Sequence, residues 1–529
     1  MALSRQLTRA LLWQAYVHLA ASIIVFRGGT IIGWNSITES LDIIRNGTLV
    51  VTNDRITTIY AAGEEPSNIT ASANQTELEV VDAVDKIITP GFIDTHRHGW
   101  QTVFRTLGSN TSLWEYFGRY GPFSSEGIFA PEDVYISQLT GLYEALNAGV
   151  TTILDHAHHT WSNETSKAGL QASIDSGARV FWAYAFNELQ NYTIDEQVVN
   201  FRDIADAAVF EGTPTTLGIA YDSFFSGKPG FLIQLTKYAL CSTFYYLYLV
   251  AKMRSREYNI SVITTHYLSG PWGVENDPET LHKFGLLNTS IPIVFSHGSF
   301  MPQSQYELLR STNQYVSITP ESEMHYGHLH PTSHLILDQA SLGIDAHFTF
   351  STDILTQARM WLQRVRAIFY SASLDEWHIP TNNPMSANQA FHLATRAGAL
   401  SLRRPDLGVI TPGAKADLVV WDGANPALLG WVDPVAAVML HASVADIEHV
   451  LIDGVFVKRN HKLTVSNYPE VKTRFLKSAR RIQGVIMDTP LPRPKQGETW
   501  ASGAQLDQAG EVDVERGEGT GYGPTWLRF

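Results

Sequence analysis

The feature that most constrains the fold of this chain is a series of short apolar runs that alternate with segments of helical periodicity between Lys86 and Asp353. Such runs are typical of buried parallel strands, and the helical segments between them supply the crossovers. We count eight strands: KIITPGFIDTH, VTTILDH, ARVFWAYAF, TTLGIAYD, ISVITTH, IPIVFSH, YVSITP and AHFTFSTD. Eight such units in about 300 residues predict an α/β fold, a closed (β/α)8 TIM barrel.

The segments on either side of the barrel have a different pattern. Alternating apolar runs split by turn residues occupy residues 23–86 and 408–465, and this pattern predicts hairpin strands. We therefore expect a small β-sandwich domain formed from both flanking segments, with the barrel (residues 87–407) inserted between them. Residues 466–529 are expected to form a C-terminal helix and a disordered tail, because the last residues are rich in Gly, Pro, Glu and Asp.

Composition narrows the classes of function. The chain has 529 residues, of which 44% are hydrophobic and 17% charged, so it is a globular protein with a large core. A net charge of −14 without a basic stripe argues against nucleic acid as a partner. The single cysteine, Cys241, allows neither an internal disulfide nor a thiolate cage, so any metal site must use histidines and carboxylates. The sequence leaves open whether the protein forms a homo-oligomer.

One apolar stretch does not fit the barrel pattern. Residues 231–251, FLIQLTKYALCSTFYYLYLVA, are about long enough to cross a membrane. A membrane helix inside the barrel would prevent the closure that the flanking strands predict, so we expect no membrane association. Two alternatives remain, a buried barrel helix and a translated intron.

The N-terminus suggests a compartment. In residues 1–22, Arg5 and Arg9 precede the mostly apolar stretch ALLWQAYVHLAAS, the layout of a secretory signal peptide. Eight Asn-x-Ser/Thr acceptor motifs for N-glycosylation follow, at Asn46, Asn68, Asn74, Asn110, Asn163, Asn191, Asn259 and Asn288. These features predict a secreted or secretory-pathway glycoprotein. The alternative is a cytoplasmic enzyme with an amphipathic N-terminal helix.

Histidines stand at the ends of the predicted strands. His96 and His98 lie two residues apart at the end of the first strand, so their side chains share one face. Other strands end in His266, His297 and Asp353. Because active sites of TIM barrels lie at the C-terminal ends of the strands, we expect these side chains to converge at one rim.

The motifs PGFIDTHRH, GAKADLVVWDG and IDGVFVKRN resemble the amidohydrolase superfamily, in its cytosine deaminase and chlorohydrolase-like branch of metal-dependent hydrolases. The resemblance covers about residues 23–465. It implies hydrolysis of a carbon–nitrogen bond that is not a peptide bond, in a cyclic amide, amidine or aminated heterocycle. The alternatives are a lyase, such as a decarboxylase, on the same scaffold and a non-catalytic protein.

The resemblance also implies roles for the rim residues. His96, His98, His266 and Asp353 would hold one divalent ion, zinc in the first place and iron as the alternative. His297 would contact the attacking water or the substrate, and Asp353 would accept the water proton. No lysine ends the GIAYD strand, so we expect one metal rather than a lysine-bridged pair.

One position departs from the family pattern. Deaminases of this branch usually carry a glutamate three residues after the third histidine, where this chain has Ser269. The candidates to replace it are Glu323 as a catalytic residue and Glu321 as a substrate contact, with Glu275 as a further alternative. Trp100, Gln101, His156 and His325 are further predicted substrate contacts. A second metal among the rim histidines stays open, as does simple packing for Trp100 and Gln101.

Overall fold

The computed structural model describes residues 22–65, 77–224, 260–329, 332–510 and 512. The predicted signal peptide, apart from its last residue, and the apolar stretch 231–251 lie outside the described residues. Within the described ranges, no helix is both long and apolar enough to cross a membrane.

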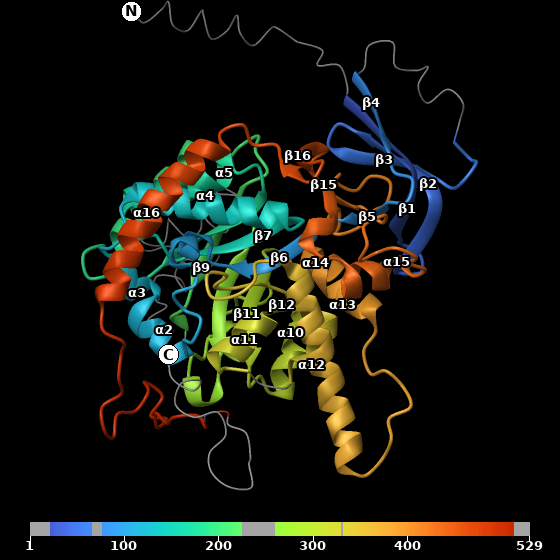
Figure 1. The fold of residues 1–529 in the computed structure, drawn as a ribbon. Helices are drawn as coiled ribbons and strands as arrows, with labels where there is room; N and C mark the ends of the chain where they lie inside the picture. The colour runs from blue at the N-terminus through green and yellow to red at the C-terminus, as the bar shows by residue number, and fades with distance from the viewer. Residues whose placement is uncertain (1–21, 66–76, 225–259, 330–331, 511, 513–529) are drawn as a thin grey trace, which may run out of the picture.

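Eight parallel strands form the barrel at the centre of the molecule (Figure 1). Each strand pairs with the next along the chain, from β6 to β13. The fold class predicted from the sequence is thus confirmed. The strands are β6 (Phe92–Arg97), β7 (Val150–Ala157), β8 (Arg179–Phe186), β9 (Thr216–Tyr221), β10 (Ile263–Leu268), β11 (Ile293–Ser299), β12 (Tyr315–Ile318) and β13 (Ala340–Leu342).

The eighth strand differs from the prediction. The sequence predicts this strand at AHFTFSTD, but the eighth strand is β13, and the predicted run forms turns and irregular chain before the next helix. β13 was missed because it has only three residues, two of them Ala and Ser, which give no apolar run. The first and last strands meet in a parallel bridge between Arg97 and Asp345.

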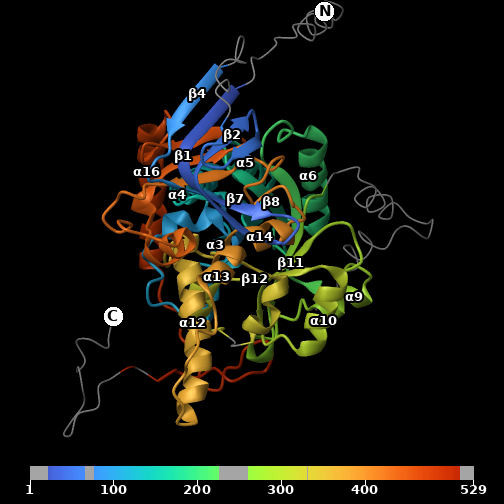
Figure 2. The same cartoon turned by 90° about the vertical axis from the view of Figure 1, so that its right-hand side faces the viewer.

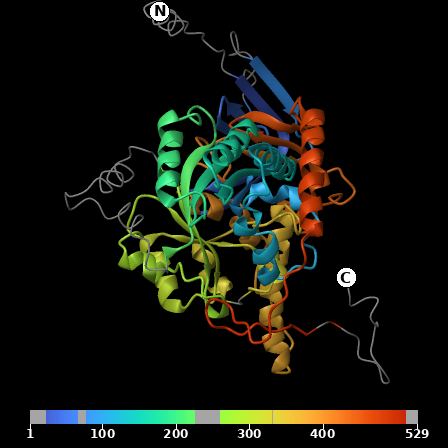
Figure 3. The same cartoon turned by 90° about the vertical axis from the view of Figure 1, so that its left-hand side faces the viewer.

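Helices surround the barrel, as Figures 2 and 3 show from two sides. Most follow the strand-then-helix alternation that the sequence predicts. The longest, α12, extends beyond the barrel. Bounds are η1 (Gly99–Phe104), α2 (Leu113–Arg119), α3 (Pro122–Ser125), α4 (Pro131–Asn147), α5 (Asn163–Asp175), α6 (Ile194–Ala207), η3 (Gly270–Trp272), α9 (Pro278–Lys283), α10 (Gln303–Thr312), α11 (Pro320–Tyr326), η4 (Ser333–Gln339), α12 (Ile354–Asp375), α13 (Ala387–Ala394) and α14 (Arg396–Ser401).

A second, nine-stranded sheet takes strands from both ends of the chain. The central contact between the two ends is antiparallel, β5 against β14. Its strands are β1 (Ser22–Asn35), β2 (Ser40–Thr52), β3 (Arg55–Tyr60), β4 (Glu77–Asp82), β5 (Ile87–Pro90), β14 (Leu418–Trp421), β15 (Ile447–Ile452), β16 (Val455–Arg459) and β17 (Lys462–Leu463). Short helices α15 (Pro434–Ala436), η5 (Ala437–His441) and η6 (Val444–Asp446) lie between β14 and β15.

The C-terminal segment begins with helix α16 (Tyr468–Asp488), which packs on α4 (Figures 1 and 3). Part of the segment predicted to be a disordered tail has defined contacts. The Trp500 indole nitrogen donates to the Trp272 carbonyl oxygen at 2.7 Å, and the Trp500 ring lies 5.5 Å from Phe117. Trp272 follows β10, the strand that carries His266, and Phe117 lies in helix α2 between β6 and β7, so this part of the tail lies over the C-terminal end of the barrel.

Arg179 joins the barrel to the second sheet. It begins β8 and donates to both carboxylate oxygens of Asp417 at 2.9 and 3.0 Å and to Asp453 at 2.7 Å. Arg179 and Asp417 are both buried. A buried carboxylate is stable only while its charge is balanced, so this ion pair fixes the sheet against the start of a barrel strand.

We expect Arg179→Ala to lower the free energy of unfolding by about 3 kcal/mol, because it leaves the Asp417 carboxylate buried without a counter-charge. Denaturant unfolding followed by circular dichroism measures this change. The control is Arg310→Ala, which removes an exposed ion pair with Asp338 and should cost less than about 1 kcal/mol. Equal losses in the two variants would contradict a role for Arg179 in joining the domains.

Candidate metal centre

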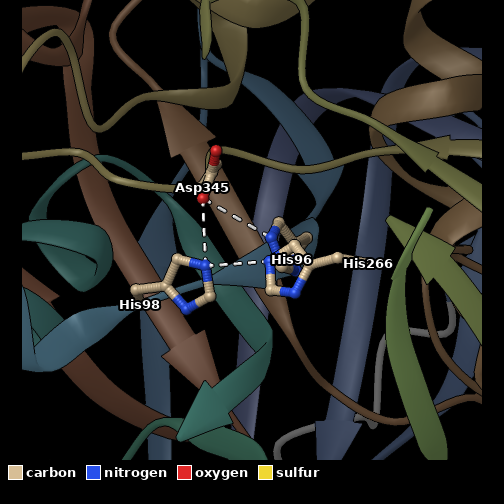
Figure 4. Close-up of side chains that lie close together, drawn as sticks. All are labelled: His96, His98, His266 and Asp345. Carbon is tan, nitrogen blue, oxygen red and sulfur yellow. Dashed lines mark hydrogen bonds and ion pairs between the residues drawn. The ribbon is translucent and has the colours of Figure 1, made fainter. Parts of the chain in front are cut away.

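Three histidines and one aspartate converge at the C-terminal end of the barrel (Figure 4). His96 lies in β6 and His98 directly follows it, His266 lies in β10, and Asp345 follows β13. One ligand atom from each lies within 4.8 Å of the others. The Nε2 atoms of His98 and His266 are 3.3 Å apart, and Asp345 Oδ1 lies 3.1 Å from His98 Nε2 and 3.5 Å from His96 Nε2.

Each histidine is oriented by a partner of its other ring nitrogen. Nδ1 of His96 lies 2.8 Å from Ser296 Oγ, and Nδ1 of His98 lies 3.0 Å from the backbone oxygen of His156. Nδ1 of His266 lies 2.9 Å from Asp222 Oδ2. A backbone oxygen and a carboxylate only accept hydrogen bonds, so His98 and His266 donate through Nδ1 and present a lone pair at Nε2.

The arrangement fits a divalent cation. Two lone-pair nitrogens and a carboxylate oxygen face one another at about 3 Å, an arrangement that repels unless a cation lies between them. Nε2 of His96 is buried and has no hydrogen-bond partner among the described residues. Burial also holds the pKa of His96 well below its usual range, so the ring is neutral. Neutral imidazoles with a carboxylate are a ligand set that zinc prefers.

Asp345, not Asp353, lies beside the histidines, and this corrects the prediction from the sequence. Asp353 is the N-cap of helix α12, where its side chain accepts from the Thr356 amide at 2.7 Å and the Thr356 hydroxyl at 2.9 Å. The error follows from the eighth strand, which ends at Leu342, eleven residues before the predicted end at Asp353. The dipeptide Ile344-Asp345 after Gly343 carried the signal, a carboxylate directly after a short strand.

His297 lies at the rim next to the cluster, as predicted. Its ring centroid is 5.3 Å from that of His96 and 5.6 Å from that of His266. The backbone at His297 has φ of 73°, a strained conformation that turns the side chain at the end of β11. Burial lowers the pKa of His297 to about 3, so the ring is neutral at physiological pH.

Glu323 lies behind His297. Its Oε1 accepts the Thr319 amide at 2.9 Å and lies 3.8 Å from Nδ1 of His297. The Thr319 hydroxyl is 2.8 Å from the same nitrogen and 3.4 Å from Glu323 Oε1, so it lies between the two groups. Burial raises the pKa of Glu323 to about 7. Glu323 therefore changes its protonation state near neutral pH.

Glu321 and His325 lie away from the cluster. The Glu321 carboxylate accepts from Ser351 Oγ at 3.0 Å and from Gln357 Nε2 at 2.9 Å, which ties it to the start of α12. His325 Nε2 lies 3.2 Å from the backbone oxygen of Gly108. The structure gives neither residue a place beside the histidines of the cluster.

Trp100 and Gln101 are packing residues of the loop after β6, not open contact surfaces. Trp100 is fully buried against Phe104, Phe129 and Trp161. The Gln101 amide donates to the Tyr116 hydroxyl at 2.7 Å and to the Tyr120 backbone oxygen at 3.0 Å. The alternative that the sequence left open, packing of this loop, is the one observed.

His156 lies at the rim, and its contacts include a residue that sequence reasoning missed. Its Nε2 is 3.2 Å from Oδ2 of Asp222, the residue that follows β9 and also holds His266. The position of Asp222 at the end of GIAYD was a usable signal, since every barrel strand ends at the same rim.

Comparisons with known proteins agree with this geometry. A model of the amidohydrolase family matches residues 87–240 and 247–457. A 5-methylthioadenosine/S-adenosylhomocysteine deaminase of Pyrococcus furiosus is 26% identical over 461 residues, 82% of this chain and 99% of that protein. A 5′-deoxyadenosine deaminase of Methanobrevibacter smithii is 23% identical over 446 residues, 83% of this chain and 94% of that protein.

Solved structures show the same fold. An adenosine deaminase from Xanthomonas campestris with bound zinc aligns with a TM-score of 0.70 at 15% identity, covering 88% of this chain and 99% of that one. Atrazine chlorohydrolase from Arthrobacter aurescens TC1 with zinc aligns with a TM-score of 0.67 at 17% identity, covering 86% and 100%. The family model spans well over half of the sequence, and the chain therefore belongs to the amidohydrolase family.

Proposed function

We propose that this amidohydrolase releases a nitrogen leaving group from a small nitrogen heterocycle, with one zinc ion held by His96, His98, His266 and Asp345. Membership of the family makes the chain a hydrolase of carbon–nitrogen bonds other than peptide bonds. The observation that carries the proposal is the convergence of three imidazoles and one carboxylate at the rim of the barrel. Bound zinc in the adenosine deaminase and chlorohydrolase structures supports zinc, and the deaminase relatives support an aminated heterocycle as substrate.

The metal supplies one part of the chemistry: a bound divalent ion lowers the pKa of a coordinated water to near neutrality. The protein supplies the rest. His297 is neutral and lies against the metal cluster, so it offers a hydrogen bond to the attacking water or to the substrate without adding positive charge. Its Nδ1 is held by Thr319, which fixes the ring orientation.

Glu323 replaces the glutamate that is missing at Ser269. It comes from α11 after β12, two strands away from β10, and contacts His297 through the Thr319 hydroxyl. Because burial raises the pKa of Glu323 to about 7, the side chain keeps a proton up to neutral pH. We assign Glu323 to proton supply through His297 during departure of the nitrogen leaving group.

The experiment for the function is ammonia release from a library of aminated heterocycles, cyclic amides and amidines. For the best substrate, Asp345→Asn should reduce turnover at least 100-fold, since removal of a metal ligand removes the activated water. Metal analysis should show loss of the ion in the same variant.

Asp353→Asn is the matched control. It alters only the cap of α12, where Asn is about as good an N-cap as Asp, so it should keep metal, activity and nearly all of the stability. Full activity in Asp345→Asn would contradict the assigned centre. Release of carbon dioxide in place of ammonia would favour the lyase alternative, which the deaminase relatives do not support.

A second prediction concerns pH. Protonated Glu323 is the donor form, and it is lost as the pH rises through about 7, so kcat/KM should fall on the alkaline side of that value. Glu323→Gln cannot ionise, so it should flatten this limb and lower kcat by about 100-fold. Glu321→Gln, a change of the neighbouring acid bonded to Ser351 and Gln357, should leave the limb in place. An unchanged alkaline limb in Glu323→Gln would remove Glu323 from the mechanism.

We also propose that the protein enters the secretory pathway and carries N-linked glycans. Five acceptor asparagines lie in the described part of the chain, and all five are exposed: Asn46, Asn110, Asn163, Asn191 and Asn288. Enzymes that remove N-glycans should lower the mass of the protein isolated from its native cells by several kilodaltons. An unchanged mass, together with an uncleaved N-terminus, would favour the cytoplasmic alternative.

A further inference from the structure

A second group of ligand-type side chains lies beside the metal centre. It consists of His156 and His158 at the end of β7 and Asp222 after β9. One ligand atom from each, and one from His266, lie within 4.8 Å of one another. We propose that His156, His158 and Asp222 bind a second divalent cation, so that the enzyme contains two neighbouring cation sites.

The hydrogen bonds of this group are incomplete. His156 is fully buried, and neither of its ring nitrogens has a hydrogen-bond partner among the described residues. Its Nε2 lies 3.2 Å from Asp222 Oδ2, but outside hydrogen-bonding geometry. Nδ1 of His158 is likewise buried without a partner in the described part of the chain. Buried polar atoms in native proteins nearly always have partners, and the unpartnered nitrogens of His156 lie beside the Asp222 carboxylate, which favours a cation between them.

The surroundings of the Asp222 carboxylate also favour a bound cation. Two other buried carboxylates of this protein, Asp94 and Asp417, face arginines, namely Arg97 and Arg179. Among the described residues, the ion-pair partners of Asp222 are His156 and His266, and those of Asp345 are likewise two histidines, His96 and His98. A carboxylate surrounded by imidazoles is the environment of a transition-metal ion.

His266 lies between the two sites and contacts residues of both. His266 presents Nε2 to the first cluster, and its Nδ1 lies 2.9 Å from Asp222 Oδ2. Asp222 Oδ1 accepts the backbone amide of His266 at 2.8 Å, so this aspartate is fixed even before a cation arrives. The His158 ring stacks on His98 with centroids 4.0 Å apart. A cation at the second site would therefore contact residues that position two ligands of the first.

The proposed ligands differ from those of two metal ions bridged by a lysine. His156 lies in β7, His158 directly follows it, and Asp222 follows β9, a strand end at which no lysine lies. Three protein ligands leave coordination positions open for water or substrate. The second ion would place positive charge next to the substrate position, where it can bind an anionic or electron-rich group of the substrate.

Metal stoichiometry tests the proposal on the full chain. Protein stripped with a chelator is titrated with Zn²⁺, freed of loose metal by gel filtration and analysed for zinc. We expect about two equivalents for the unmodified enzyme and about one for His156→Gln and for His158→Gln. His159→Asn is the matched control, because His159 lies in the same segment but faces Trp182, so it should keep two equivalents.

Asp345→Asn separates this proposal from the proposed function. It should lose the first ion and keep the second, so about one equivalent should remain. One equivalent in the unmodified enzyme, or equal zinc in it and in His156→Gln, would overturn the second site while leaving the first intact. Complete loss of zinc in both Asp345→Asn and His156→Gln, with the circular dichroism spectrum unchanged, would show one shared site and also overturn the proposal.

Discussion

The closure of the barrel between its first and last strands is the interaction on which the rest of the structure depends. The backbone oxygen of His96 accepts the amides of Ile344 and Asp345 at 3.0 and 2.8 Å. Gly343 allows this approach, since a side chain there would lie 2.9 Å from His96 and 2.6 Å from Ser317 Oγ. The same hydrogen bonds that close the ring thus place the Asp345 carboxylate beside His96 and His98.

Polar side chains inside the barrel fix the register of this closure. Thr95 Oγ1 lies 2.7 Å from Ser317 Oγ and 2.9 Å from Ser341 Oγ, and Asp94 accepts the Ile344 amide at 3.1 Å. The charge of Asp94 is balanced by Arg97, which is itself buried. A buried polar network is favourable only when its members find their partners, so a shift of one residue would leave several unpaired. This network explains how a last strand of only three residues keeps a defined position.

Features that depend on the local sequence pattern could be predicted from the sequence. Features that depend on contacts between distant residues could not. Seven strands were found from apolar runs, and His96, His98 and His266 from their places at strand ends. β13 has no apolar run of its own and is defined by its pairing with β12 and the bridge to β6, so the carboxylate was assigned eight residues too late. Trp100 shows the same limit. Its place after the metal pair indicated a substrate contact, but contacts from Phe129 and Trp161, distant in sequence, bury it.

The absence of a glutamate at Ser269 has a structural consequence for the proton path. In this chain the acid nearest to His297 comes from α11, so the proton source and the third histidine ligand are carried by different strands. On the other side of β10, the neighbouring strand β9 is followed by Asp222. Its carboxylate accepts the His266 backbone amide and contacts the His266 ring. The contacts with His156 and His266 hold the pKa of Asp222 well below its usual range, so Asp222 stays ionised and does not donate a proton. Burial raises the pKa of Glu323 to about 7, so Glu323 can hold a proton at neutral pH. The different surroundings of the two carboxyl groups therefore give them different roles: Asp222 orients ligands, and Glu323 exchanges protons.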